Sequence, residues 1–146
     1  MKSRLIFASI SLFAAQLCYA QNPAVGLWKT IDDKTGKVKS LVRITESGGE
    51  LQGKIERLFR TADQEQNPKC DACEGANKDQ PIIGMTILYG LKKDGDEFNG
   101  GSILDPNNGK LYRSKIKVVD NAKKLEVRGF IGFSIFGRSQ TWVREE

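Results

Sequence analysis

Apolar and polar side chains alternate along most of the chain after Gly26, which is the pattern of half-buried β-strands. In residues 38–45, for example, one face carries Val42 and Ile44 and the other carries Lys39 and Arg43. The pattern predicts eight strands, over residues 26–32, 38–45, 51–59, 85–91, 97–104, 111–119, 125–130 and 138–144.

Short turns separate most of these predicted strands. Asp94-Gly95 is a hairpin signal, because glycine supplies the positive φ that tight hairpin turns need. The segment Asp105–Gly109 combines proline, asparagine and glycine, each of which favours a turn. Gly100-Gly101 lies inside a predicted strand and indicates a bulge or a sharp bend. Consecutive short turns predict an antiparallel meander.

Eight strands in up-and-down order are best closed into a barrel, because closure removes the free edges that invite aggregation. We therefore predict an all-β, antiparallel, eight-stranded barrel, with an open sandwich as the alternative. The interior of such a barrel is either filled by side chains or holds one small ligand. One long polar loop, residues 60–81, interrupts the strand pattern, and loops of that length are usually functional or mobile.

Residues 1–20 are predicted to be a secretory signal peptide, followed by a single domain over residues 21–146. Lys2 and Arg4 precede an apolar run, Leu5–Ala15, and Ala20 offers a small residue for cleavage. The run is too short to span a bilayer. Lipoprotein processing before Cys18 is an alternative, although it would need a small residue where Leu17 stands. We expect a periplasmic or secreted protein.

Charge and composition limit the possible functions. Removal of residues 1–20 lowers the net charge from +5 to +3, and the remaining basic residues are scattered rather than gathered on one face. This pattern does not favour nucleic-acid binding. No later apolar segment is long enough to cross a membrane.

The chain has no histidine, which removes the usual general base near neutral pH and most metal ligation. We therefore predict no enzyme activity, no cofactor and no metal. A hydrolase that uses carboxylates is the weaker alternative, with Asp32, Asp33 and Asp105 as candidates, although all three lie at turns that aspartate favours for local hydrogen bonding.

Cys70 and Cys73 form the only cysteine pair after residue 20. A redox pair of the thioredoxin type would begin a helix after a strand, and a zinc site would need about four ligands. A structural disulfide within the 60–81 loop is the remaining interpretation, and an oxidising compartment would maintain it.

Large side chains are spread over many of the predicted strands, where they either fill the core or line a ligand cavity. The candidates for the core or cavity are Trp28, Tyr89, Ile103, Tyr112, Arg128, Phe130, Phe133 and Trp142. Of these, Tyr89, Tyr112 and Arg128 could orient a ligand through polar contacts.

Several short motifs give the chain a family resemblance. They are Gly26-Leu-Trp28, Pro81-Ile-Ile-Gly-Met85, Ile103-Leu-Asp-Pro106, Val127-Arg-Gly-Phe-Ile-Gly132 and Gly137-Arg-Ser-Gln-Thr-Trp142. With them the chain resembles a family of small exported bacterial proteins, domain of unknown function 2147. The resemblance implies a lipocalin-like barrel with an internal cavity. It also implies that Trp28 packs against Arg144, or Arg138, to close one end of the barrel.

The leading functional hypothesis is an exported protein that binds a small apolar or amphipathic molecule. The alternative is a cell-envelope interaction module that uses the 60–81 loop as its contact surface and a filled barrel as scaffold. The sequence identifies no protein partner.

Overall fold

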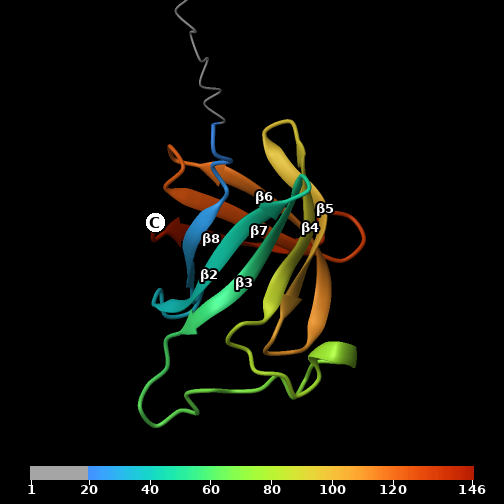
Figure 1. Cartoon of the computed structure of the whole chain (residues 1–146). Coiled ribbons are helices and arrows are strands. Elements are labelled where there is room, and N and C mark those ends of the chain that lie inside the picture. Colours follow the sequence, from blue (N-terminus) through green and yellow to red (C-terminus); the bar gives the residue numbers. More distant parts are fainter. Residues whose placement is uncertain (1–19) are drawn as a thin grey trace, which may run out of the picture.

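Eight strands and one short 3-10 turn make up the computed structural model, which describes residues 20–146 (Figure 1). The predicted signal peptide, apart from its last residue, lies outside the described residues. The elements are β1 (Gly26–Ile31), β2 (Val38–Ser47), β3 (Glu50–Leu58), η1 (Gly75–Asn77), β4 (Thr86–Asp94), β5 (Glu97–Asp105), β6 (Lys110–Val119), β7 (Lys124–Phe130) and β8 (Gly137–Arg144). Every strand begins within one residue of its predicted start.

Each strand pairs antiparallel with the next, and β8 returns to pair with β1. The closing pairs are Trp28 with Arg144 and Lys29 with Val143. The sheet is therefore a closed barrel, as predicted, and the open sandwich is excluded. The predicted bend in β5 is also present, because the β5–β6 register shifts between Phe98 and Gly101.

The meander gives the barrel two different ends (Figure 1). The chain on either side of the barrel, residues 20–25 and 145–146, lies at one end with the β2–β3, β4–β5 and β6–β7 turns, and we call this the closed end. The β1–β2 turn, the long β3–β4 loop, the β5–β6 turn and the β7–β8 loop form the other end, which we call the open end.

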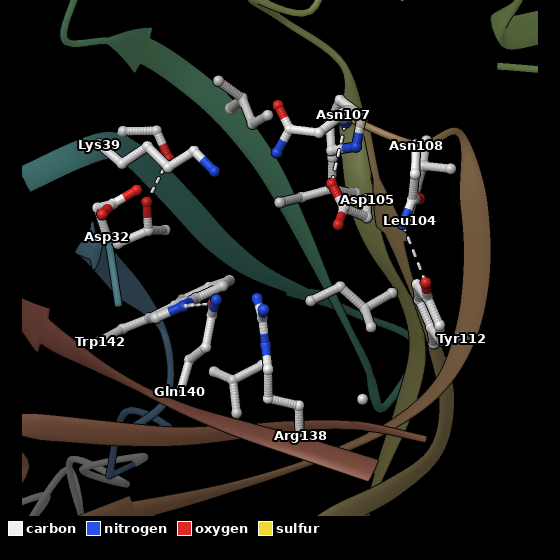
Figure 2. A pocket seen from close by; sticks show the side chains of 18 of the residues that line it. Asp32, Lys39, Leu104, Asp105, Asn107, Asn108, Tyr112, Arg138, Gln140 and Trp142 are labelled. Carbon is white, nitrogen blue, oxygen red and sulfur yellow. Dashed lines mark hydrogen bonds between the residues drawn. The ribbon is translucent and has the colours of Figure 1, made fainter. Parts of the chain in front are cut away.

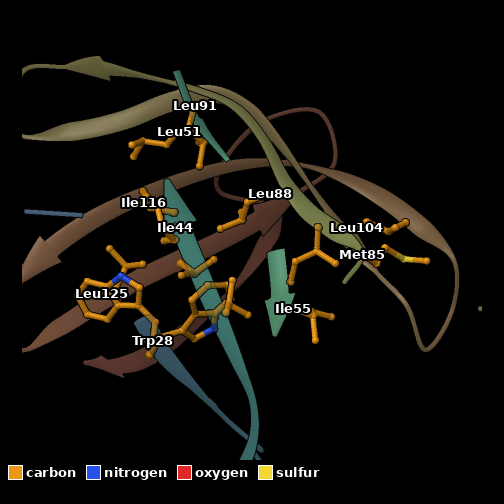
Figure 3. Packing of buried hydrophobic residues seen from close by; sticks show 14 of the residues in the cluster. Trp28, Ile44, Leu51, Ile55, Met85, Leu88, Leu91, Leu104, Ile116 and Leu125 are labelled. Carbon is orange, nitrogen blue, oxygen red and sulfur yellow. The ribbon is translucent and has the colours of Figure 1, made fainter. Parts of the chain in front are cut away.

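Large apolar side chains such as Trp28 and Leu125 fill the half of the barrel near the closed end, and Ile55, Met85 and Leu104 continue the cluster toward the open end (Figure 3). Trp28 is fully buried, and its indole N–H donates to the carbonyl of Ala24 at 2.9 Å. The guanidinium carbon of Arg144 lies 4.2 Å from the centroid of the Trp28 ring. Arg144 also donates to the carbonyls of Ala122 at 2.5 Å and Val25 at 3.2 Å. One arginine thereby satisfies carbonyls of the β6–β7 turn and of the segment before β1, and it covers the tryptophan with a cation–π contact.

The β3–β4 loop folds back against the β5–β6 turn at the open end. Cys70 and Cys73 form a disulfide, as predicted, and both are buried. The Sγ atom of Cys70 lies 3.4 Å from the carbonyl oxygen of Pro106. A side chain at Gly109 would overlap the carbonyl of Ala72, so the loop and the turn meet backbone to backbone. The disulfide segment is therefore fixed on the rim of the barrel.

Candidate functional site: a cavity at the open end

A cavity of about 850 Å³ occupies the half of the barrel near the open end. Its wall is formed by apolar residues of the strands, among them Ile55, Ile87, Ile103 and Val127, with Trp142 on the side of the filled core. Pockets that hold small ligands have volumes of roughly 300 to 1,000 Å³. The barrel interior is therefore neither fully packed nor hollow throughout.

The cavity exists because inward side chains become smaller along the strands toward the open end. On β1, Trp28 is followed by Thr30 at the next inward position, and Thr30 borders the cavity. On β7, Leu125 and Val127 are followed by Gly129. The same trend holds on β2, which goes from Val42 to Ser40, and Ser40 also borders the cavity. Small residues near the open end of these three strands leave space that large residues fill nearer the closed end.

Polar side chains surround the mouth of the cavity (Figure 2). Asp32 and Lys39 lie on one side, Asp105 and Asn108 lie on the other, and Gln140 points in from β8. An apolar wall with a polar rim matches the two ends of an amphipathic molecule. A polar group at the rim would keep contact with water while an apolar group entered the barrel.

The two carboxylates that border the cavity both cap turns. Asp32 accepts hydrogen bonds from the backbone amides of Lys34 at 3.0 Å and Thr35 at 2.8 Å. These bonds, chiefly those from the Thr35 amide and hydroxyl, lower the pKa of Asp32 below its ordinary value of 3.8. Asp105 likewise accepts from the amide of Asn107 at 2.9 Å. A carboxylate with a lowered pKa is poorly suited to take up a proton near neutral pH.

The basic groups at the mouth are less engaged than the carboxylates. Among residues 20–146, neither Lys39 nor Arg60 has a carboxylate within ion-pair distance. Arg138 lies 3.4 Å from Asp33, which also accepts a hydrogen bond from Gln140 at 3.2 Å. The rim therefore presents more available donors than available acceptors.

Two hydrogen bonds between side chains stabilise the polar part of the cavity wall. The hydroxyls of Thr30 and Ser40 lie 2.6 Å apart across β1 and β2, and both residues are buried. The amide of Asn108 donates to the hydroxyl of Tyr112 at 3.0 Å. Rim groups are thereby held in fixed positions before any ligand arrives, which reduces the ordering cost of binding.

The residues that the sequence singled out for the core or cavity lie in three places, which are the cavity wall, the filled core and the region of the β7–β8 loop. Four of them line the cavity, namely Ile103, Tyr112, Phe130 and Trp142. Trp28 belongs to the filled core instead. Tyr89 packs against the core and donates to the carbonyl of Thr86. Arg128 and Phe133 lie at the β7–β8 loop and do not border the cavity.

Of the two arginines proposed to close the barrel, Arg144 is the one that covers Trp28. Arg138 shares the inward phase of β8 with Arg144, but it lies at the mouth of the cavity and its side chain is largely exposed. The two positions are equivalent in the alternation of the strand and differ in their height along the barrel. A periodic pattern cannot distinguish them.

Sequence reasoning missed most of the rim. Arg60, Gln64 and Asn108 border the cavity from loops and turns, where no periodicity marks the direction of a side chain. Lys39 also borders the cavity, although the alternation in residues 38–45 placed it on the face opposite Val42 and Ile44. Gln140 is the exception that a signal could have found. It lies between Arg138 and Trp142 in the inward phase of β8, and a polar residue that faces inward in a barrel indicates a solvated interior.

Residues 20–146 contain neither a membrane-spanning helix nor a cluster of metal-ligating side chains. No helix in this part of the chain is long and apolar enough to cross a membrane. No group of three or more His, Cys, Asp or Glu side chains in the described residues is arranged to hold a metal ion.

Comparison with known proteins is consistent with this architecture. The family described as uncharacterized protein conserved in bacteria (DUF2147) matches residues 26–144. Among solved structures, the chain is similar to protein HP1028 from the human pathogen Helicobacter pylori, which is described as belonging to the lipocalin family. The TM-score is 0.69 at 20% identity, over 84% of this chain and 82% of that chain. No curated protein matches. The predicted lipocalin-like fold is confirmed.

Proposed function

Because the chain belongs to the DUF2147 family of bacterial proteins and has a lipocalin-like fold, we propose that it is an exported protein that holds one small hydrophobic or amphipathic molecule in its barrel. The observation that carries this proposal is the cavity of about 850 Å³ with an apolar wall and a polar rim. Export is supported by the disulfide, since such bonds persist in oxidising compartments.

The site suits an amphipath better than a fully apolar ligand. The apolar end would contact Ile55, Ile87 and Ile103, and burial of each methylene group would contribute about 0.8 kcal/mol. The polar end would stay at the rim, where Lys39 and Arg60 carry positive charge and could donate hydrogen bonds to it. The carboxylates at the rim are already occupied by turn amides, so a ligand with acceptor or anionic groups fits best.

Binding of a fluorescent dansyl fatty acid, and its displacement by unlabelled fatty acids, tests the proposal. Ile103→Trp should fill part of the cavity, because Ile103 lies on its wall. Ile83→Trp makes the same exchange at a position that is 37% exposed and does not border the cavity. We expect Ile103→Trp to weaken dye binding by about tenfold or more, the effect of about 1.4 kcal/mol, and Ile83→Trp to leave it unchanged.

Native mass spectrometry of the protein from its producing cell gives an independent readout, because a bound molecule would appear as added mass. The proposal fails if the unaltered protein binds no dye saturably and carries no added mass. Equal loss in both tryptophan variants would place the dye outside the cavity and would also count against it.

The interaction-module alternative stays a prediction. Residues 61–67 of the β3–β4 loop are all exposed. Three residues of the same loop, Arg60, Gln64 and Ile82, also border the cavity. Deletion of residues 63–78 should abolish capture of a protein partner if this loop is the contact surface, and the barrel should remain folded.

A further inference from the structure

The β7–β8 loop, residues 131–136, exposes four large apolar side chains. Ile131 is 67% exposed, Phe133 76%, Ile135 76% and Phe136 68%. Single exposed apolar residues are ordinary on protein surfaces. A contiguous group of this kind marks an interaction with a membrane or with another protein.

Hydrogen bonds hold the loop in the shape that exposes these side chains. The amide of Phe136 donates to the carbonyl of Phe133 at 3.0 Å, which closes a tight turn at the tip. Arg128 reaches from β7 and donates through Nε to the carbonyl of Ser134 at 2.6 Å. It also donates to the hydroxyl of Ser139 on β8 at 2.8 Å. The backbone that carries the apolar side chains is therefore held in place by these hydrogen bonds.

Three arginines flank this apolar tip. Arg113 on β6 has its guanidinium carbon 5.7 Å from the centroid of the Phe130 ring, Arg128 on β7 donates to the carbonyl of Ser134, and Arg138 lies at the start of β8. Between Arg113 and Arg138 the sequence has two acidic residues, Asp120 and Glu126, and Asp120 lies in the β6–β7 turn at the closed end. Of the three arginines, only Arg138 has a carboxylate within ion-pair distance in the described part of the chain, and that is Asp33 at 3.4 Å.

The acidic part of the open end lies elsewhere. The β3–β4 loop carries Asp63, Glu65, Asp71, Glu74 and Asp79. Figure 1 shows the β7–β8 loop projecting from one side of the barrel, well away from the β3–β4 loop below it. An approaching anionic surface would therefore meet the apolar tip and its cations first.

We propose that the β7–β8 loop docks the barrel on the surface of a lipid bilayer that contains anionic lipids. Apolar side chains next to basic ones insert at the boundary between headgroups and acyl chains, while the cations contact the headgroups. A protein partner is a poorer fit, because a standard interface needs about 20–30 residues on each side and this tip is a narrow loop. Docking does not require a ligand in the barrel and so goes beyond the proposed function.

The β7–β8 loop lies beside the mouth of the cavity, so docking would also position that mouth. Ile131 and Phe136 border the cavity, so the docking tip and the cavity mouth share a wall. A docked barrel would hold its mouth close to the bilayer. A molecule could then pass between the lipid and the cavity with less exposure to water.

Cosedimentation with vesicles tests the proposal directly. The protein is purified from producing cells and its N-terminus is read by mass spectrometry, because an uncleaved Leu5–Ala15 run would itself bind lipid. The vesicles contain equal parts phosphatidylcholine and phosphatidylglycerol, or phosphatidylcholine alone. We expect binding to the anionic vesicles, weaker binding to the neutral ones, and a loss of binding as salt is raised.

A tip variant and a matched control separate the loop from apolar exposure in general. Phe133→Ser with Ile135→Ser removes the two most exposed apolar side chains of the tip, neither of which borders the cavity. Phe59→Ser with Ile83→Ser makes the same two exchanges at exposed positions in the β3–β4 loop, and because Phe59 borders the cavity this control is measured by vesicle binding alone. We expect the tip variant to lose about tenfold or more in vesicle affinity, since each side chain contributes apolar burial. The control should bind as the unaltered protein does.

Three results would overturn the proposal. They are absence of vesicle binding by the unaltered protein, equal loss in the tip variant and the control, and self-association without lipid that the tip exchanges abolish. The last result would assign the loop to a second copy of the chain. The failure of docking is distinguishable from the failure of ligand binding. The tip variant should keep dye binding in vesicle-free solution, and Ile103→Trp should keep vesicle binding.

Discussion

The two halves of this barrel are built from the same strands, yet one is packed and the other is hollow. Strand β8 shows the difference within a few residues. At one end Arg144 covers Trp28 and donates to backbone carbonyls of the β6–β7 turn and of the segment before β1. At the other end Arg138 stands at an open mouth with a largely exposed side chain. Alternation decides which side chains face inward, but the size of those side chains at each level decides whether the interior is a core or a cavity.

Replacing one tryptophan by alanine in each half of the barrel should give the largest difference in stability between the two halves. Trp28→Ala removes a fully buried indole, its hydrogen bond to Ala24 and the surface on which Arg144 stacks. We expect a loss of about 3–5 kcal/mol in the free energy of unfolding. Trp142→Ala should cost less, because that ring borders a cavity that already exists and its N–H lies 3.4 Å from Gln140. Urea denaturation of both variants measures the difference. Equal losses would mean that the cavity is closed in solution.

The two arginines of β8 allow a second matched comparison. Arg144→Gln should lower the free energy of unfolding by about 2 kcal/mol, because it removes the cation–π contact and leaves carbonyls at the closed end with fewer donors. Arg138→Gln should change stability by less than about 0.5 kcal/mol, since exposed ion pairs contribute little. Thermal unfolding monitored by tryptophan fluorescence measures both. A larger loss at Arg138 would show that the mouth also stabilises the barrel.

Two glycines with nearly the same backbone conformation test how firmly the β3–β4 loop is fixed. Gly109 has φ of 70° and Gly132 has φ of 71°, so alanine is strained at both positions. At Gly109 a Cβ atom would also overlap the carbonyl of Ala72, whereas nothing lies within 4 Å of a Cβ at Gly132. We expect Gly132→Ala to cost about 1 kcal/mol and Gly109→Ala to cost more and to lift the loop.

The rate at which the Cys70–Cys73 disulfide is reduced reports that displacement, because both cysteines are buried against the rim. Reduction should be faster in Gly109→Ala and unchanged in Gly132→Ala. Equal rates in the two variants would contradict a fixed loop.

The sequence alone predicted the strands, the turns and the disulfide of this fold because each depends on local chemistry. Period-two alternation placed every strand start to within one residue. The position of the C-x-x-C pair in a polar loop, together with the shortage of other metal ligands, left a disulfide as the remaining interpretation. Closure was predicted from the cost of free edges, and the β1–β8 pairing confirms it. These features need no knowledge of which residues meet across the barrel.

The division into core and cavity could not be predicted in the same way. It depends on which inward residues share a level around the barrel, and that is set by irregularities such as the register shift between Leu41 and Val42 on β2. Arg138 and Arg144 have the same phase, so the pattern gave no reason to choose between them. The rim residue Arg60 lies in a loop, where alternation gives no direction, and Lys39 borders the mouth although alternation placed it on the face opposite Val42 and Ile44.

Two buried serines test how the packed half and the cavity half meet, and they should give the smallest changes in the free energy of unfolding. Ser114 is 1% exposed on the inward face of β6, between Gly101 and Gly129, and among residues 20–146 its hydroxyl has no hydrogen-bond partner. Ser40 is also buried, but its hydroxyl pairs with that of Thr30 at 2.6 Å on the cavity wall. Removing an unpaired buried hydroxyl relieves a desolvation cost, whereas removing a paired one leaves its partner unsatisfied.

We therefore expect Ser114→Ala to raise the free energy of unfolding by up to about 1 kcal/mol and Ser40→Ala to lower it by about 1 kcal/mol. Denaturant titration of the two variants separates these signs. A loss at Ser114 similar to that at Ser40 would mean that its hydroxyl is hydrogen-bonded in solution, and that the polar lining of the cavity extends one level deeper toward the core.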